Sequence, residues 1–151
     1  MKIYLDVSCL NRPYDDQSQV RIRLEAEAMT VILEKCEHGE WQQVSSQMAK
    51  IEIDAMPDAE RRARVRLLLP DPKVVLELTE DLYARAADLE KRGFKPADAV
   101  HVAAAEALDA DVFLSCDDRL VRLGRRRRNE VKVKLANPLD WLKEIGHDAD
   151  A

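Results

Sequence analysis

Carboxylate side chains follow directly after two short apolar runs of this sequence. Asp6 comes after residues 3–5, while Asp117 and Asp118 come after residues 112–115. Apolar runs of this length predict buried strands. If these strands are neighbours in a parallel sheet, their carboxyl ends meet at one edge and bring the acids together. Carboxylates at close range repel unless one is protonated or a cation lies between them, and hard Mg²⁺ or Mn²⁺ is the natural candidate.

Each of these acids also has a simpler interpretation. Asp6 can cap a loop, and Asp118 can cap the helix that follows it. Asp98 lies two residues after Pro96, in the first turn of an apolar helix, where the helix dipole favours a carboxylate with or without a function. Glu52 shares one flank of its helix with apolar side chains, so it is either solvated at the edge of that stripe or needs a partner.

The elements that must position these acids alternate between strand and helix. Strands are predicted over residues 3–5, 41–44, 73–78, 112–115 and 131–135, and helices over 18–38, 45–56, 57–69, 79–92, 97–108, 118–127 and 137–142, with a loop at 11–16. The alternation predicts an α/β sandwich with a mostly parallel sheet and right-handed crossovers. The helix over 97–108 is apolar nearly all round, so we expect it to lie buried against the sheet.

Composition limits the class of protein. The chain has 151 residues, of which 46% are hydrophobic and 35% charged, with a net charge of -5. This is typical of one soluble domain over residues 1–151, with 146–151 expected to form a flexible tail. No apolar run approaches the ~20 residues of a membrane helix, and the first six residues contain no signal-peptide core, so we expect a cytoplasmic protein without membrane contact.

The cysteines and the net charge exclude further classes. Cys9, Cys36 and Cys116 are odd in number and lack metal-ligand spacing, so they predict small buried thiols, not a zinc site or a disulfide framework. The negative net charge gives no global attraction to nucleic acid, so any such binding needs local basic patches or metal ions.

Four segments taken in order resemble the PIN-domain nucleases: residues 5–8, 45–52, 96–101 and 113–117. The resemblance covers nearly the whole chain and implies a PIN-like three-layer sandwich with about five strands flanked by helices. The resemblance implies that four residues are the catalytic and metal-binding acids: Asp6, Glu52, Asp98 and Asp117. Ser8 and Ser115 match as supporting hydroxyls, and Asp118 is a second-ranked ligand because it also suits a helix cap.

The activity implied by the resemblance is metal-dependent hydrolysis of RNA. The family includes the VapC toxins of bacterial toxin–antitoxin pairs, so the resemblance implies Mg²⁺ or Mn²⁺ as cofactor, RNA as substrate, products with a 5′-phosphate, an antitoxin partner and a homodimer. A water made more acidic by a bound metal would attack the phosphodiester. The loop at 11–17, Cys9 and Cys116 depart from the core family pattern, so we expect the specificity to differ from that of typical toxins.

Basic residues offer a surface for RNA phosphates. Six arginines fall within residues 119–128, and four of them are the candidates for RNA binding: Arg119, Arg122, Arg125 and Arg126. The alternative is a solvated helix end. His101, three residues after Asp98, is expected to be a satisfied core histidine, not a ligand.

Two other functions are weighed against the nuclease. A catalytically weak PIN-fold module that binds nucleic acid or protein is favoured by the net charge of -5. A phosphoryl-transfer receiver or phosphatase is disfavoured, because Val7 and Ser8 stand where such proteins carry paired acids.

Overall fold

The computed structural model describes residues 1–146 and contains one parallel sheet. Its five strands are arranged in the order β3-β2-β1-β4-β5, and every neighbouring pair is parallel. The strands are β1 (Lys2–Leu5), β2 (Gln42–Ser46), β3 (Val75–Leu76), β4 (Val112–Leu114) and β5 (Lys134–Ala136). The chain builds the sheet outward from β1 to β3 and then returns to the other side of β1 with β4, so the strand order reverses between β1 and β4.

The register between β1 and β4 fixes which residues meet at the edge. Ile3 pairs with Val112 and Leu5 with Leu114, and the backbone N–H of Asp6 donates to the carbonyl of Leu114 at 2.9 Å. The first residues beyond the two strands therefore leave the sheet side by side. In parallel sheets the crevice beyond the carboxyl ends at such a reversal point is the usual place for a ligand.

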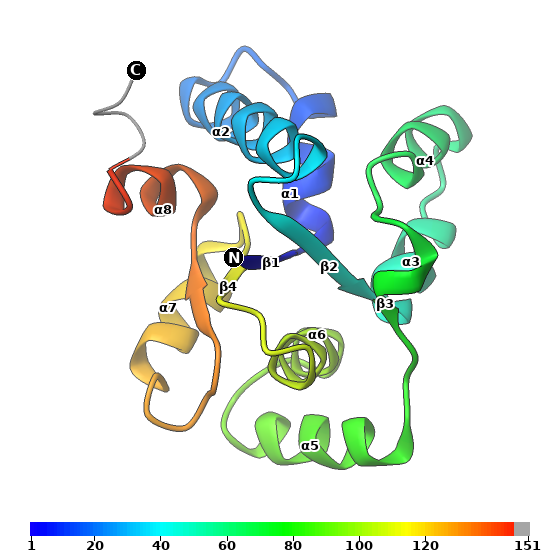
Figure 1. Cartoon of the computed structure of the whole chain (residues 1–151), viewed down its shortest axis with the longest axis vertical. Coiled ribbons are helices and arrows are strands. Elements are labelled where there is room, and N and C mark those ends of the chain that lie inside the picture. The colour runs from blue at the N-terminus through cyan, green and yellow to red at the C-terminus, as the bar shows by residue number, and fades with distance from the viewer. Residues whose placement is uncertain (147–151) are drawn as a thin grey trace.

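Helices cover both faces of the sheet (Figure 1). On one face lie α5 and α6, and on the other lie α1 and α2. The helices are α1 (Val7–Asn11), α2 (Val20–Glu37), α3 (Gln47–Asp54), α4 (Ala59–Arg66), α5 (Glu80–Lys91), α6 (Pro96–Ala107), α7 (Asp118–Arg126) and α8 (Pro138–Glu144), with short 3-10 turns η1 (Arg12–Tyr14) and η2 (Pro72–Val74). The predicted α/β sandwich is thereby confirmed, and its sheet is entirely parallel.

Alternation along the central strands divides the core in two. Tyr4 and Phe113 pack with α5 and α6, whereas Ile3 and Leu114 pack with α1, α2 and α8. Every residue from 99 to 105 of α6 is buried, which confirms the prediction of a helix lying flat against the sheet. Burial on every side of α6 is possible because α5 covers the face turned away from the sheet.

Three local predictions are corrected by the structure. Helix α1 precedes the predicted loop and η1 lies inside it. Helix α1 forms because Val7, Cys9 and Leu10 bury an apolar face. Helix α4 begins at Ala59 and not at Pro57, since Asp58 caps its first turn. The last strand is shorter than predicted and pairs only over Lys134–Ala136.

The core-facing side of α2 also differs from the apolar spacing in the sequence. Val20 and Leu24 are 59% and 39% exposed, while Glu25, Met29 and Ile32 are buried. A buried glutamate is tolerated there because Arg12 pairs with it at 2.9 Å.

Two expectations concern the ends of the chain and the membrane. The predicted tail over residues 146–151 lies outside the described residues except for Gly146. Within residues 1–146, no helix has the length and apolar character to cross a bilayer.

A candidate acidic site at the sheet edge

Asp6 lies at the centre of a hydroxyl network just beyond β1. Its Oδ2 accepts hydrogen bonds from the hydroxyls of Ser8 at 2.8 Å and Ser115 at 2.7 Å. Both serines are themselves held, since Ser8 Oγ accepts from the backbone N–H of Cys116 and Ser115 Oγ accepts from that of Asp117. The carboxylate is therefore fixed from both strands, and its 7% exposure leaves only the edge open to solvent. Asp6 occupies the N-cap position of α1, but its side chain makes no capping hydrogen bond to that helix.

The helix cap expected of Asp118 is made by Asp117 instead. Asp117 is the residue that caps α7, with Oδ1 accepting from the backbone N–H groups of Arg119 and Leu120. Asp118 does not cap the helix but forms a two-pronged ion pair with Arg21 of α2. The hydrogen bonds from Arg21 lower the pKa of Asp118. Held in this pair, Asp118 is a poor candidate for a further metal ligand.

Glu52 ends a hydrogen-bonded chain that runs out of the core. Glu52 Oε1 bonds His101 Nε2, His101 Nδ1 lies 2.7 Å from the hydroxyl of Tyr4, and that hydroxyl lies 2.7 Å from Ser46 Oγ. His101 is 1% exposed with both ring nitrogens bonded, so it is the satisfied core histidine that was expected. Burial alone would lower the pKa of His101, but the Glu52 bond and the charges of Asp6 and Asp98 outweigh it and raise the pKa.

The protonated histidine fits this chain of hydrogen bonds. With both ring nitrogens carrying protons, His101 donates to Glu52 and to the Tyr4 oxygen, and Tyr4 can donate onward to Ser46. Glu52 therefore faces a cation on one oxygen and presents the other outward with its side chain 34% exposed. The flank that carries Glu52 is mixed, since Met48 packs against the core while Ile51 is 52% exposed.

The charges of the other three acids affect the pKa of Asp98. Burial, followed by the charges of Asp6, Asp117 and Glu52, raises its pKa to about 6, with His101 acting in the opposite direction. Asp98 and Asp117 line one small cavity of about 10 Å³, whose other charged neighbours are Lys95 and Arg119. The structure thus brings the four predicted acids into one electrostatic cluster.

The donor types in this cluster fit a hard divalent cation. Each of the four carboxylates keeps an oxygen that accepts no hydrogen bond from residues 1–146: Oδ1 of Asp6, Oε2 of Glu52, both oxygens of Asp98 and Oδ2 of Asp117. Oxygen ligands of this kind are those that Mg²⁺ and Mn²⁺ prefer. In the same described part of the chain, no three acidic, histidine or cysteine side chains are close enough together to form a finished metal site. The fit therefore rests on ligand chemistry, and closing the site requires side-chain adjustment.

The predicted arginines do not form one patch. Arg119, Arg122 and Arg126 recur at the spacing that places side chains along one side of α7, starting beside Asp117. Arg125 instead lines a groove along β5 together with Arg128. Arg127 pairs with Glu130. Only the first three therefore extend from the acidic cluster.

The comparison with protein families decides the identity of the fold. The family model of the PIN domain matches residues 3–126. The chain belongs to the PIN domain family. Members of this family are generally nucleases. No curated protein matches the sequence.

A solved structure supports the same PIN fold. The crystal structure of VapBC2 from Rickettsia felis bound to a DNA fragment from their promoter matches with a TM-score of 0.58 and 12% identity, covering 91% of this chain and 98% of that chain. At this identity the likeness concerns the fold.

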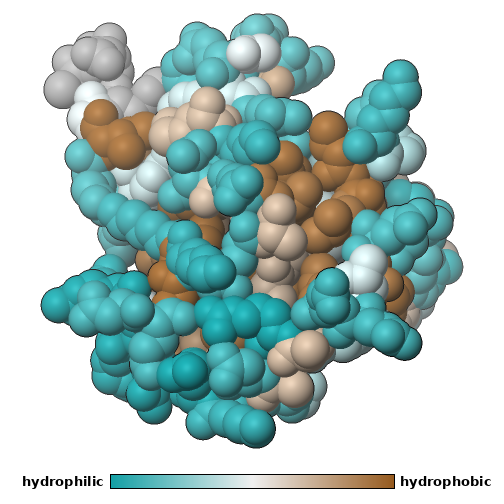
Figure 2. All heavy atoms as spheres, turned by 60° about the horizontal axis from the view of Figure 1, so that its bottom comes forward, coloured by the Kyte–Doolittle hydropathy of each residue, from teal (hydrophilic) through white to brown (hydrophobic). Residues whose placement is uncertain are grey.

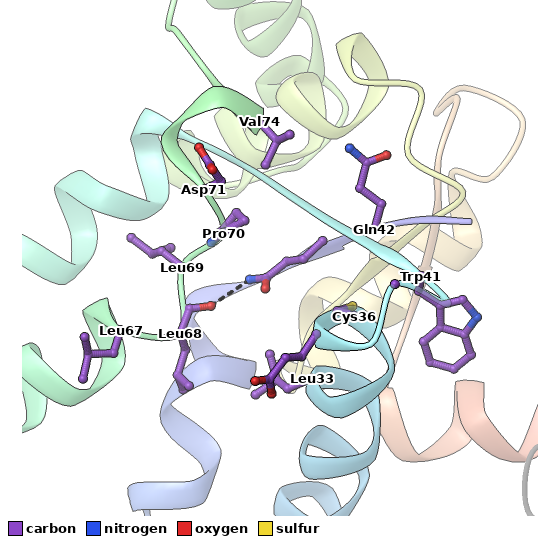
Figure 3. Close-up of a pocket in the computed structure, with 13 residues that line it drawn as sticks. Leu33, Cys36, Trp41, Gln42, Leu67, Leu68, Leu69, Pro70, Asp71 and Val74 are labelled. Carbon is purple, nitrogen blue, oxygen red and sulfur yellow. Dashed lines mark hydrogen bonds between the residues drawn. The ribbon is translucent and has the colours of Figure 1, made fainter.

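A larger groove of this PIN domain lies away from the acids. It measures about 620 Å³ and lies between the end of α2 and residues 67–71 (Figure 3). Its lining includes Leu33, Trp41 and Leu68, with Gln43 Nε2 donating to the Leu68 carbonyl at 3.0 Å. Figure 2 shows exposed hydrophobic side chains on the right side of the view, the side on which Figure 1 labels α3, α4 and β3. The groove is lined mainly by apolar side chains, and its titratable lining residues are Cys36, Glu37 and Asp71.

Two groups of residues that organise the site were not found from the sequence. One is the series of hydrogen bonds that links Ser46, Tyr4 and His101 to Glu52. The other is Arg21, the ion-pair partner of Asp118. The only sequence signal for the first is a histidine, a tyrosine and a serine in segments predicted to be buried. For Arg21 no local signal exists, because its partner lies 97 residues away.

Proposed function

We propose that this PIN domain is a Mg²⁺- or Mn²⁺-dependent endoribonuclease that hydrolyses RNA phosphodiester bonds at Asp6, Glu52, Asp98 and Asp117. Three observations support the proposal: Asp6 and Asp117 lie just beyond the neighbouring strands β1 and β4, Asp98 lines one small cavity with Asp117, and the charges of Asp6, Asp117 and Glu52 act on Asp98. Repulsion within such a cluster is what a bound cation relieves.

The roles of the residues follow from their contacts. Asp6, oriented by Ser8 and Ser115, would hold the cation together with Asp117, Asp98 and Glu52. When bound, a divalent cation lowers the pKa of water and stabilises charge on phosphate oxygens. If a single cation leaves Asp98 free, that carboxylate could accept a proton from the attacking water. Glu52 is an alternative proton acceptor, oriented by His101.

The direct test is single-turnover cleavage of a mixed structured RNA pool with Mg²⁺ or Mn²⁺. We expect wild type to cut and the Asp6→Asn and Asp117→Asn variants to lose at least about a hundredfold in rate, the scale of a lost electrostatic contact to the transition state. Asp118→Asn is the matched control, because Asp118 is engaged by Arg21. Cutting that persists in Asp6→Asn would show that the cleavage does not depend on the proposed site and would end the proposal.

RNA binding is assigned to the α7 stripe of Arg119, Arg122 and Arg126, with Arg125 as an outlying contact on the β5 side. Replacing the three stripe arginines by glutamine should weaken RNA affinity and flatten its salt dependence by about two units of slope at most, since each phosphate contact contributes about 0.7 for a single strand. The control is the Arg125→Gln, Arg128→Gln double variant, which should change the slope less in a filter-binding salt series. Equal effects in both variants would argue against a track on α7.

The partners follow from the same proposal. We propose a homodimer in the cytoplasm that is the toxin of a toxin–antitoxin pair and is neutralised by an antitoxin protein. Support comes from the fold shared with a structure described as VapBC2 and from apolar side chains left on the surface, among them Val20 and Leu24 of α2. Co-expression with the protein encoded by the adjacent gene tests this, and failure of that protein to co-purify or to inhibit cleavage would count against it.

The second candidate is a catalytically weak PIN-fold module that binds nucleic acid or protein. It is favoured by the pairing of Glu52 with His101 and by the lack of a finished three-ligand metal group within residues 1–146. No cutting by folded wild type in either metal would support this candidate, and cutting lost in Asp6→Asn would exclude it.

A further inference from the structure

Two buried cysteines meet beside the acidic site. Cys9 lies in α1, which follows β1, and Cys116 lies just beyond the neighbouring strand β4. Because the two strands leave the sheet side by side, Cys116 Sγ lies 3.8 Å from Cys9 Sγ. Cys9 Sγ also donates a hydrogen bond to the carbonyl of Leu114 at 3.3 Å. The proposed hydrolysis of RNA uses neither thiol.

The contact between these thiols is close to the geometry of a disulfide. A disulfide holds its sulfurs about 2.0 Å apart, so Cys9 and Cys116 need to approach by about 1.8 Å to form one. The third cysteine offers a comparison within the same chain. Cys36 lines the groove between α2 and residues 67–71 and makes no hydrogen bond to another thiol within residues 1–146.

The two thiols differ in their access to solvent. Cys116 is 7% exposed, whereas Cys9 is fully buried. Burial raises the pKa of the Cys9 thiol, so this thiol keeps its proton and reacts poorly with an oxidant in solution. A small oxidant such as hydrogen peroxide therefore reaches Cys116 first, and Cys9 only has to reach Cys116. An accessible thiol next to a second, resolving thiol is a common arrangement in reversible cysteine oxidation.

Both cysteines are also connected by hydrogen bonds to the surroundings of Asp6. The backbone N–H of Cys9 donates to the Asp6 carbonyl at 2.9 Å. The backbone N–H of Cys116 donates to Ser8 Oγ at 3.1 Å, and Ser8 in turn donates to Asp6 Oδ2. Asp117 follows Cys116 directly in the chain. Drawing the two sulfurs together must move at least one cysteine, and this displaces the groups that hold Asp6 or Asp117.

We propose that Cys9 and Cys116 are an oxidation site that closes into a disulfide and weakens the acidic site. Hydrogen peroxide transfers one oxygen to Cys116 Sγ, its O–O bond breaks, and water leaves. Cys9 Sγ then attacks the Cys116 sulfur, the S–S bond forms and the S–O bond breaks, and the hydroxyl leaves with the Cys9 proton as a second water. The two sulfurs lose two electrons, which the peroxide gains.

The first test is peptide mapping by mass spectrometry of the full chain, after peroxide treatment and alkylation of the remaining thiols. We expect a linked peptide pair that contains Cys9 and Cys116, a mass lower by two hydrogen atoms, and an alkylated Cys36. Dithiothreitol should restore all three thiols. Failure to find the Cys9–Cys116 link, or a disulfide that involves Cys36, would overturn the proposal. Mapping of wild type needs no variant, so it stands even if a core substitution impairs folding.

Single cysteine variants test the order of the two steps. Cys9→Ala removes the resolving thiol, so oxidation should stop at a sulfenic acid on Cys116, which dimedone traps. Cys116→Ala should leave Cys9 unoxidised under the same conditions, because Cys9 is fully buried. Cys36→Ala is the matched control and should form the disulfide at the wild-type rate. Equal dimedone labelling of Cys9 and Cys116 in the two variants would contradict the proposed order.

The effect on the acidic site is tested by activity, and this part rests on the proposed nuclease. The reduced and oxidised forms of Cys36→Ala are compared in single-turnover RNA cleavage. We expect the oxidised form to be about tenfold slower or more, because misplacing a catalytic group by about 1 Å costs up to about a hundredfold, and dithiothreitol should restore the rate. Equal rates would overturn the effect on the site. If neither form cuts but the disulfide forms, the nuclease proposal fails and the oxidation site stands.

Discussion

At the scale of single residues, the acidic site is a balance between burial and repulsion. Asp6 is stabilised by two hydroxyls, Asp117 by the first N–H groups of α7, and Glu52 by His101. Asp98 accepts no hydrogen bond from residues 1–146 and faces the charges of the other three. Part of the cost of gathering the acids therefore falls on Asp98, and its charge is expected to lower stability.

This cost gives a prediction about pH. The pKa of Asp98 rises from 3.8 to about 6 on folding, so the native state binds more protons than the unfolded state between those values. Stability is then lost as the pH rises from about 4 to about 6. Without divalent metal, Asp98→Asn should have a higher unfolding temperature than wild type at pH 7.5, and the difference should shrink at pH 4. Asp81→Asn, at an exposed helix first turn, is the control and should show no such trend.

At the scale of elements, α7 connects the site to the β5 edge of the sheet. Asp117 caps its start, and Gly124 lets its end approach β5 closely. A Cβ at Gly124 would lie 2.7 Å from Leu135 Cδ2 and 2.8 Å from Leu135 Cβ, and the second of these atoms cannot move without the strand.

Gly124→Ala should therefore push α7 away from β5. We expect a loss of about 1–3 kcal/mol in the free energy of unfolding, typical of overpacking. Urea denaturation measures it, and Arg126→Ala on an exposed side of the same helix should change stability by less than about 0.5 kcal/mol. A Gly124→Ala variant as stable as wild type would show that helix and strand are not in such close contact.

At the scale of the whole molecule, Glu25 joins segments that are distant in sequence. It is 0% exposed on α2 and accepts hydrogen bonds from Arg12 of η1 and Asn137 at the start of α8, with Arg21 Nε at 3.5 Å. Arg21 in turn holds Asp118 of α7. One network of hydrogen bonds and ion pairs thus joins η1, α2 and the start of α8 to Asp118 at the start of α7.

Removing Glu25 should weaken the whole domain. Glu25→Ala leaves a partly buried arginine and a buried amide without their partner, so we expect a loss of about 3–5 kcal/mol, as for other broken buried pairs. The midpoint of urea unfolding measures this change. Glu27→Ala, exposed on the same helix, is the control, and a similar small effect in both variants would contradict the role assigned to Glu25.

The sequence by itself determined the order of strands and helices and the placing of acids at strand ends. Both depend on local patterns that act over a few residues. These patterns are apolar runs, helix caps such as Thr79, and the glycines at Gly39 and Gly93. The alanine-rich run of α6 likewise predicted its burial. The short α1 was missed because five residues show too little periodicity.

Only the tertiary structure decided which side chains became partners. His101 meets Glu52 across 49 residues, and Arg21 meets Asp118 across 97, which turned Asp118 from a candidate ligand into half of an ion pair. The contact between Cys9 and Cys116 is equally invisible in sequence, where the two thiols are 107 residues apart. Pairings of this kind depend on strand order and packing, and these arise from contacts between segments that no local pattern specifies.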